Sequence, residues 1–84
     1  MANTQEEVMY LSDMLDGASF KVKKVDLGKE VGKRLADMGF TEGAEGRIVR
    51  RGIFHDPLEV HILGYEVLIR RFEASKIAVE STCA

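Results

Sequence analysis

Apolar and polar residues alternate along several short stretches of the chain, as in Phe20–Lys23 and Leu58–Ile62. A period of two is typical of strands that bury one face and expose the other. Leu63 and Gly64 separate two of these stretches at the spacing of a hairpin turn. The predicted strands, about five in all, are residues 20–25, 46–54, 58–62, 65–70 and 77–79.

The segment DLGKEVGKRLADMGF follows a helical period instead. Asp26 has the side chain of a residue that begins a helix. Gly39 stands where a left-handed residue ends one, and Phe40 is placed to fold back onto the helix. The sequence therefore predicts one amphipathic helix between the first two strands. Its apolar residues share one face: Leu27, Val31, Leu35 and Met38.

Eighty-four residues are enough for one domain with one small core. A short sheet that curls on itself buries one face and removes most free edges, which suits a core of small aliphatic residues. We therefore predict a mainly β fold, a small barrel of about five strands with an inserted α-helix, over residues 11–80. A polar lead-in (1–10) precedes it, and a tail (81–84) follows it.

Composition and charge are those of an ordinary soluble protein, with 45% hydrophobic residues, 31% charged residues and a net charge of -2. Cys83 is the only cysteine, so no intramolecular disulfide is expected, as is usual in a reducing cytosol. The first residues lack the features of a secretion signal, and no apolar run approaches the roughly 18 residues of a membrane span. We expect a cytoplasmic protein without direct membrane insertion.

No catalytic motif is present in the sequence. The glycines at 28, 32, 39 and 43 are not followed by the Gly-Lys-Ser/Thr ending that cradles phosphates. We therefore do not expect an enzyme, and in particular no nucleotide hydrolysis.

His55, Asp56 and His61 surround the only proline, and imidazole and carboxylate are suitable ligands for iron or zinc. His55 precedes the strand, however, while His61 lies within it and faces away from its apolar neighbours. Convergence on one ion would need further ligands from elsewhere. Two solvated histidines are the favoured interpretation, and a metal site is the alternative.

Basic residues are concentrated in the middle of the chain, where residues 19–51 hold nine bases and five acids. Small barrels do bind nucleic acids, but the net acidity and the absence of an exposed aromatic series argue against this alternative. We expect a solvated face or the rim of a protein interface instead. The residues concerned are Lys21, Lys23, Lys24, Arg47, Arg50, Arg51, Arg70 and Arg71.

Three segments occur together in the order of a known family. LADMGFTEG, GRIVRR and DPLEVHILGYEVLIRRFEASKIAVE resemble the FeoA family of ferrous-iron-transport accessory proteins over residues 11–80. The resemblance implies an SH3-like barrel in a cytoplasmic protein that works with FeoB, a membrane ferrous-iron transporter with its own GTP-binding domain. The same fold also occurs as the C-terminal module of iron- and manganese-dependent repressors, so a metal-sensing module stays open as an alternative.

The resemblance also indicates where a partner binds. The inserted helix and the turn after it distinguish the chain from a bare barrel, and a tyrosine follows the hairpin turn. No cofactor is expected, and weak binding of Fe(II) or another divalent transition metal belongs to the alternative only. Association with a membrane would run through the transporter. We expect the cytosolic part of the transporter to contact Lys33, Arg34, Met38, Gly39, Phe40, Thr41 and Tyr65.

Overall fold

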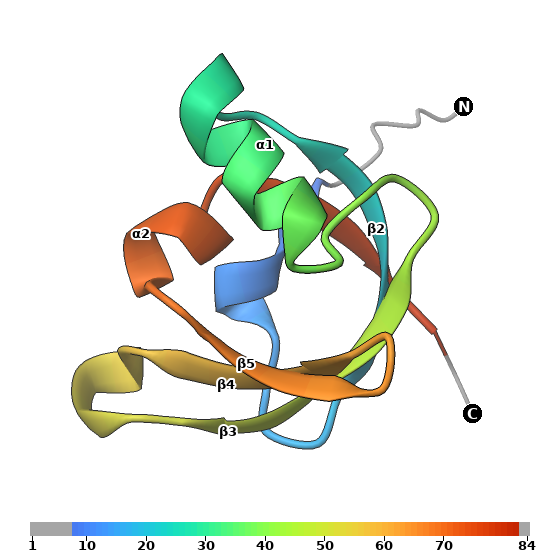
Figure 1. Ribbon diagram of the computed structural model, residues 1–84. Coiled ribbons are helices and arrows are strands. Elements are labelled where there is room, and N and C mark those ends of the chain that lie inside the picture. Colours follow the sequence, from blue (N-terminus) through green and yellow to red (C-terminus); the bar gives the residue numbers. More distant parts are fainter. Residues whose placement is uncertain (1–7, 83–84) are drawn as a thin grey trace, which may run out of the picture.

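The computed structural model describes residues 8–82, which form one antiparallel sheet of six strands. The sheet curls around a single core, and its strand order is β1-β6-β2-β3-β4-β5 (Figure 1). The predicted fold class, mainly β with an inserted helix, is confirmed. The strands are β1 (Met9–Tyr10), β2 (Ser19–Val25), β3 (Glu45–Arg51), β4 (Leu58–Ile62), β5 (Tyr65–Ile69) and β6 (Ile77–Ser81).

Four helical segments connect the strands. The inserted helix α1 (Lys29–Asp37) lies between β2 and β3, and the short α2 (Arg71–Ala74) lies between β5 and β6 (Figure 1). Two 3₁₀ turns are η1 (Leu11–Asp13), which follows β1, and η2 (Ile53–His55), which joins β3 to β4.

The end of α1 is built as predicted, but its beginning is not. Gly39 adopts a φ of +113°, and the Phe40 N–H donates to the Leu35 carbonyl at 2.9 Å, which closes the helix. The residue that precedes the helix is Gly28, and the prediction of Asp26 was wrong. The Asp26 N–H instead donates to the Lys76 carbonyl at 2.8 Å, which holds this residue in extended chain.

The core lies inside the curled sheet and is closed on one side by α1. Leu35 of α1 and Phe40 after it are fully buried together with side chains from β2 to β6. Apolar burial of this kind supplies most of the stability of a small domain. The fully buried large side chains are Leu11, Phe20, Val22, Leu35, Phe40, Ile48, Leu58, Val60, Ile62, Ile69 and Ile77.

Several strand boundaries differ from the sequence prediction, and two of the differences change the fold description. Met9 and Tyr10 pair with β6 as a sixth strand, although these residues were expected to belong to the polar lead-in. The third strand ends at Arg51 and not at residue 54, because the chain turns at Gly52 into η2. Residues 1–7 of the expected lead-in and Cys83 lie outside the described residues. Among residues 8–82, no helix combines the length and apolarity that a membrane span requires.

Candidate functional site

The helix end and the β4–β5 hairpin turn lie against each other. A Cβ atom on Gly39 would stand 3.2 Å from Leu63 Cδ1 and 3.3 Å from Ile62 Cγ2. The end of the helix and the hairpin turn that carries Leu63 and Tyr65 are therefore in contact. Thr41, two residues after Gly39, lines a hollow between α1 and β2 together with Lys33. We call the surface over the helix end and the hairpin turn the helix–turn surface and define it by Lys33, Met38, Thr41, Leu63 and Tyr65.

The helix–turn surface is partly apolar. Tyr65 is 68% exposed and Leu63 is also exposed, while Met38 is half-buried against the core. Lys33 and Thr41 are exposed at its edge. An exposed tyrosine is typical of a protein contact, in which its aromatic ring supplies buried area.

Two of the predicted partner residues lie inside the molecule. Phe40 is 1% exposed and packs in the core, and Gly39 is buried in the contact between helix and hairpin. The Phe40 side chain cannot touch a partner in this conformation, and Gly39 has no side chain, so both residues only determine the shape of the surface. Arg34 is exposed, but its guanidinium pairs with the Glu73 carboxylate of α2.

The candidate metal ligands are separated in the structure. His55 ends η2, whereas His61 lies in β4 opposite Arg47 of β3 and Glu66 of β5. The Asp56 carboxylate is already engaged, since its Oδ1 accepts the Arg71 N–H at 3.0 Å. Nowhere in residues 8–82 do three or more His, Cys, Asp or Glu side chains form a group able to hold a metal ion.

Many of the basic residues are matched by carboxylates on neighbouring elements. Arg51 pairs with Asp16 at 3.2 Å and Lys23 with Glu80 at 3.5 Å. Arg50 on β3 pairs in the same way with Glu59 on β4, at 3.1 Å. This pairing reduces the positive potential that a phosphate backbone would need.

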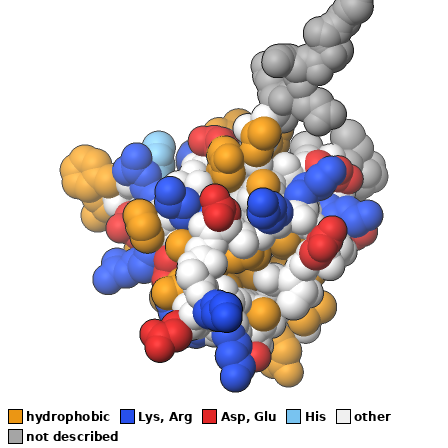
Figure 2. Space-filling model, turned by 90° about the horizontal axis from the view of Figure 1, so that it is seen from above, with side chains coloured by type: hydrophobic (Ala, Val, Ile, Leu, Met, Phe, Trp, Pro, Cys, Tyr) orange, Lys and Arg blue, Asp and Glu red, His pale blue; other side chains and the backbone are white. Residues whose placement is uncertain are grey.

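The η2 turn carries the most exposed large apolar side chains of the described residues. Ile53 is 80% exposed and Phe54 is 85% exposed. Apolar side chains project at the left margin of Figure 2, next to a histidine and basic side chains, at the end of the molecule where β3 meets β4 in Figure 1. Ile53 and Phe54 were predicted as strand because they continue the alternating pattern of β3. Gly52 and the nearby proline are the two local signals that the strand stops.

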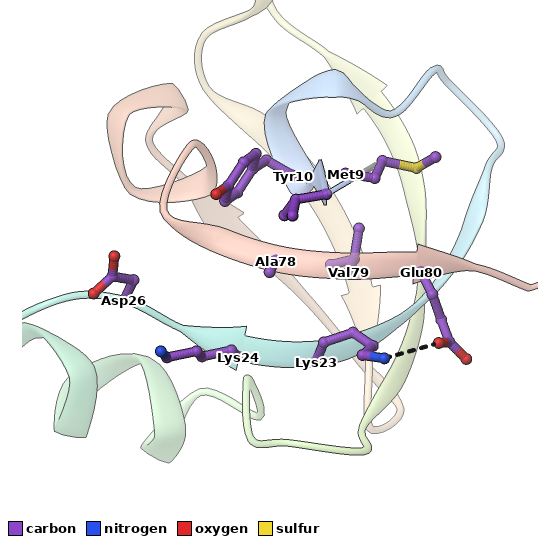
Figure 3. Close-up of a pocket in the computed structure, with 9 residues that line it drawn as sticks. Met9, Tyr10, Lys23, Lys24, Asp26, Ala78, Val79 and Glu80 are labelled. Atoms are coloured by element: carbon purple, nitrogen blue, oxygen red, sulfur yellow. Dashed lines mark ion pairs between the residues drawn. The ribbon is translucent and has the colours of Figure 1, made fainter. Parts of the chain in front are cut away.

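An open groove of about 560 Å³ lies over β1, β6 and the adjoining part of β2 (Figure 3). Met9 and Tyr10 form one side of it, and Lys23 and Lys24 form the other. The Lys23 ammonium on β2 is paired with the Glu80 carboxylate on the neighbouring strand β6. No histidine, cysteine, serine or threonine lines it, so the groove lacks a hydroxyl or thiol nucleophile paired with an imidazole base. The Met9 thioether is the one soft metal ligand among its lining residues.

Comparison with known proteins gives a consistent result. A family model described as the FeoA domain matches residues 9–81. A Porphyromonas gingivalis protein described as a Fe(2+) transport protein A/Fe(2+) transporter FeoB fusion is 33% identical over 72 residues. The match covers 86% of the present chain and 8% of the fusion protein, so the chain spans only a small part of this relative.

Solved structures of similar sequence share the fold. The solution structure of the FeoA protein from Chlorobium tepidum is 33% identical, with a TM-score of 0.84, over 89% of this chain and 71% of that one. The crystal structure of Stenotrophomonas maltophilia FeoA, described as a prokaryotic SH3 domain protein complexed with zinc, is 32% identical, with a TM-score of 0.74. That match covers 86% of this chain and 89% of the other. The expected SH3-like architecture is thus confirmed.

Proposed function

The chain belongs to the FeoA family, and from this premise we propose that it is a non-enzymatic accessory protein of ferrous iron transport. In this proposal it works in the cytoplasm, docks on the cytosolic part of a FeoB-type transporter and modulates it. Its association with the membrane runs through the transporter alone.

One observation carries the proposal. In the Porphyromonas gingivalis relative, a domain similar to this chain and a FeoB transporter are described as one fusion protein. Domains fused in one organism are held at high effective concentration, which benefits proteins that act on each other. For this chain, the same association would form between separate molecules.

Modulation requires a difference in affinity between two conformations of the transporter. A protein that bound both conformations equally would shift nothing, however tightly it bound. The chain therefore acts, in this proposal, by binding one conformation of the cytosolic part better than the other. It supplies contacts and leaves the nucleotide chemistry to its partner.

We propose the helix–turn surface as the contact. It combines an exposed aromatic ring, an exposed leucine and a lysine on elements that the core holds in place. The buried residues Gly39 and Phe40 fix its shape by closing α1 and packing the turn onto the hairpin. A preformed surface loses little conformational entropy on binding.

Binding of the purified chain to the cytosolic part of the FeoB-type transporter from the same cells tests this function. We expect binding that weakens at least about tenfold in a Lys33→Glu/Tyr65→Ala variant, because an aromatic anchor and a charge are lost together. Arg47→Glu is the matched control, since Arg47 is exposed on β3 and has no ion pair within residues 8–82. Absence of binding by the unmodified chain would refute the proposed function, and equal binding by both variants would refute the placement of the contact.

A further inference from the structure

We infer that the chain has a second docking site, in which Ile53 and Phe54 of η2 insert into an apolar pocket of a protein partner rimmed by carboxylates. We call these two residues the apolar knob. The inference rests on the proposed function in one respect, namely that the partner is the cytosolic part of the transporter.

Exposure is the first argument. Ile53 and Phe54 are adjacent, large and apolar, and they have more of their surface in water than the other large apolar side chains described. Phe72, at the beginning of α2, is 67% exposed, and a hollow lined by Asp56, Arg71, Phe72 and Ser75 adjoins the segment after the knob. Apolar surface that is contiguous and rimmed by polar groups marks an interaction site more often than scattered apolar residues do.

The backbone of the turn is the second argument. Phe54 and His55 have φ values of +59° and +64°, which are rare and costly for residues with bulky side chains. Two backbone hydrogen bonds nevertheless hold this conformation in place. The Gly52 N–H donates to the Pro57 carbonyl and the His55 N–H to the Gly52 carbonyl, both at 2.8 Å.

Gly52 itself is required for the turn. A Cβ atom there would stand 2.7 Å from the Asp56 carbonyl oxygen, which is closer than real contacts allow. Asp56 in turn ties the end of the turn to α2, since its Oδ1 accepts the Arg71 N–H at 3.0 Å. The knob is thus presented at a fixed angle, as an anchor for a shaped pocket needs to be.

Charge indicates the chemistry of the partner. Arg70 and Arg71 are exposed and lie next to the turn through their contacts with Asp56. The Arg70 guanidinium is 3.9 Å from the Asp56 carboxylate, whereas Arg71 has no ion pair within residues 8–82. A carboxylate at the rim of an apolar pocket would complement the Arg71 guanidinium.

A lipid surface fits these observations less well than a protein. The other arginines at this end, Arg50 and Arg51, are each paired with a carboxylate, which leaves few free cations for an anionic bilayer. A bilayer also has no shaped pocket, so the fixed conformation of the turn would not improve the fit between the knob and a lipid surface. The geometry therefore favours a protein partner.

The knob is separate from the helix–turn surface. The two lie at opposite ends of β4 and β5, each five residues long, which corresponds to about 16 Å. Variants at one surface therefore leave the other intact, and the two contacts are testable one at a time.

Substitutions of Phe54 test the knob against the purified cytosolic part of the transporter. Phe54→Asn removes the apolar ring and suits the left-handed backbone, because asparagine tolerates this conformation. We expect its melting temperature to equal or exceed that of the unmodified chain, while its affinity falls at least about tenfold. Phe54→Leu should retain most of the affinity, and Val8→Asn, at an exposed apolar residue before β1, should retain all of it.

The binding results distinguish failure of the docking site from failure of the proposed function. If the unmodified chain binds and Phe54→Asn binds equally well, the knob is not a docking site and the proposed function stands. If the unmodified chain does not bind, both proposals fall. Co-sedimentation with phosphatidylglycerol-containing vesicles completes the test: vesicle binding lost in Phe54→Asn, with transporter binding unchanged, would overturn the protein pocket in favour of lipid.

Discussion

Glycine at position 46 is required by packing and not by backbone conformation. A Cβ atom there would stand 2.7 Å from the His61 carbonyl oxygen and 2.8 Å from Phe20 Cζ. The first neighbour is backbone of β4 and the second is a fully buried ring, so neither can move away at low cost. Between β2, β3 and β4, the structure therefore leaves no room for a side chain at this residue.

We predict that Gly46→Ala lowers the free energy of unfolding by about 2 kcal/mol, since overpacking of a core has this order of cost. Gly32→Ala is the matched control. Gly32 lies inside α1, where a Cβ atom would meet only an ordinary contact at 3.6 Å from the Leu27 carbonyl oxygen. The Gly32→Ala variant should raise the free energy of unfolding by up to about 1 kcal/mol. Urea denaturation of both variants measures the two free energies of unfolding. Equal effects at the two glycines would contradict the packing argument.

Phe54 shows where prediction from residue type stops. Gly39 was predicted to be left-handed because glycine adopts that conformation freely, and Phe40 was predicted to fold back because a helix ended before it. Nothing in the residue type of phenylalanine indicates a φ of +59°. The conformation is imposed by contacts around Gly52 and Asp56. The exposure of the Phe54 side chain could not be predicted either, because the alternating pattern continues through this residue as it would in a strand.

At the scale of elements, α1 is held to the sheet and to α2 by different means. Its apolar face packs on the core through Leu35, and its exposed face is tied to α2 by the ion pair of Arg34 with Glu73. The Glu73 side chain is largely covered, and its Oε1 also accepts the Arg70 N–H at 3.4 Å. This carboxylate therefore joins α1, the end of β5 and α2.

We predict that Glu73→Gln lowers the free energy of unfolding by about 1 kcal/mol, because a charge-assisted contact between two elements is lost. Glu30→Gln, at an exposed residue of α1, should change it by less than about 0.5 kcal/mol. Chemical denaturation gives both values. A double-mutant cycle with Arg34→Ala should show coupling, and additive effects would mean that the pair does not join the helices.

Elements with a local signal were predicted better than the contacts between them. The period of two placed β2, β4 and β5, and the stripe of apolar residues placed α1. The pair of Arg34 with Glu73 was not predictable, because 39 residues separate its members along the chain. β1 was missed for a related reason, since two residues have no period and form a strand only by pairing with β6.

At the scale of the whole molecule, the helix end, Thr41 and Tyr65 were named as partner residues before the fold was known, and this assignment stays a prediction. The fold adds that Gly39 packs on the hairpin, so the helix end and the hairpin turn lie together. The knob at the other end was not named. If both proposed surfaces bind, the chain contacts two parts of a partner at once, which is one way to favour a single conformation of that partner.

The positions of the candidate metal ligands argue against a stable metal site. His55 and His61 lie on different elements, and the Asp56 carboxylate is engaged with α2. We predict that Fe(II), added without oxygen, leaves the melting temperature of the chain unchanged. A saturated site at a hundredfold excess over its Kd would contribute about 2.7 kcal/mol. For a domain of this size, that corresponds to a rise of at least about 10 °C. Such a rise, if the His55→Ala/His61→Ala variant lost it, would restore the metal-sensing alternative, because only ligation by these side chains links the ion to the folded state in that way.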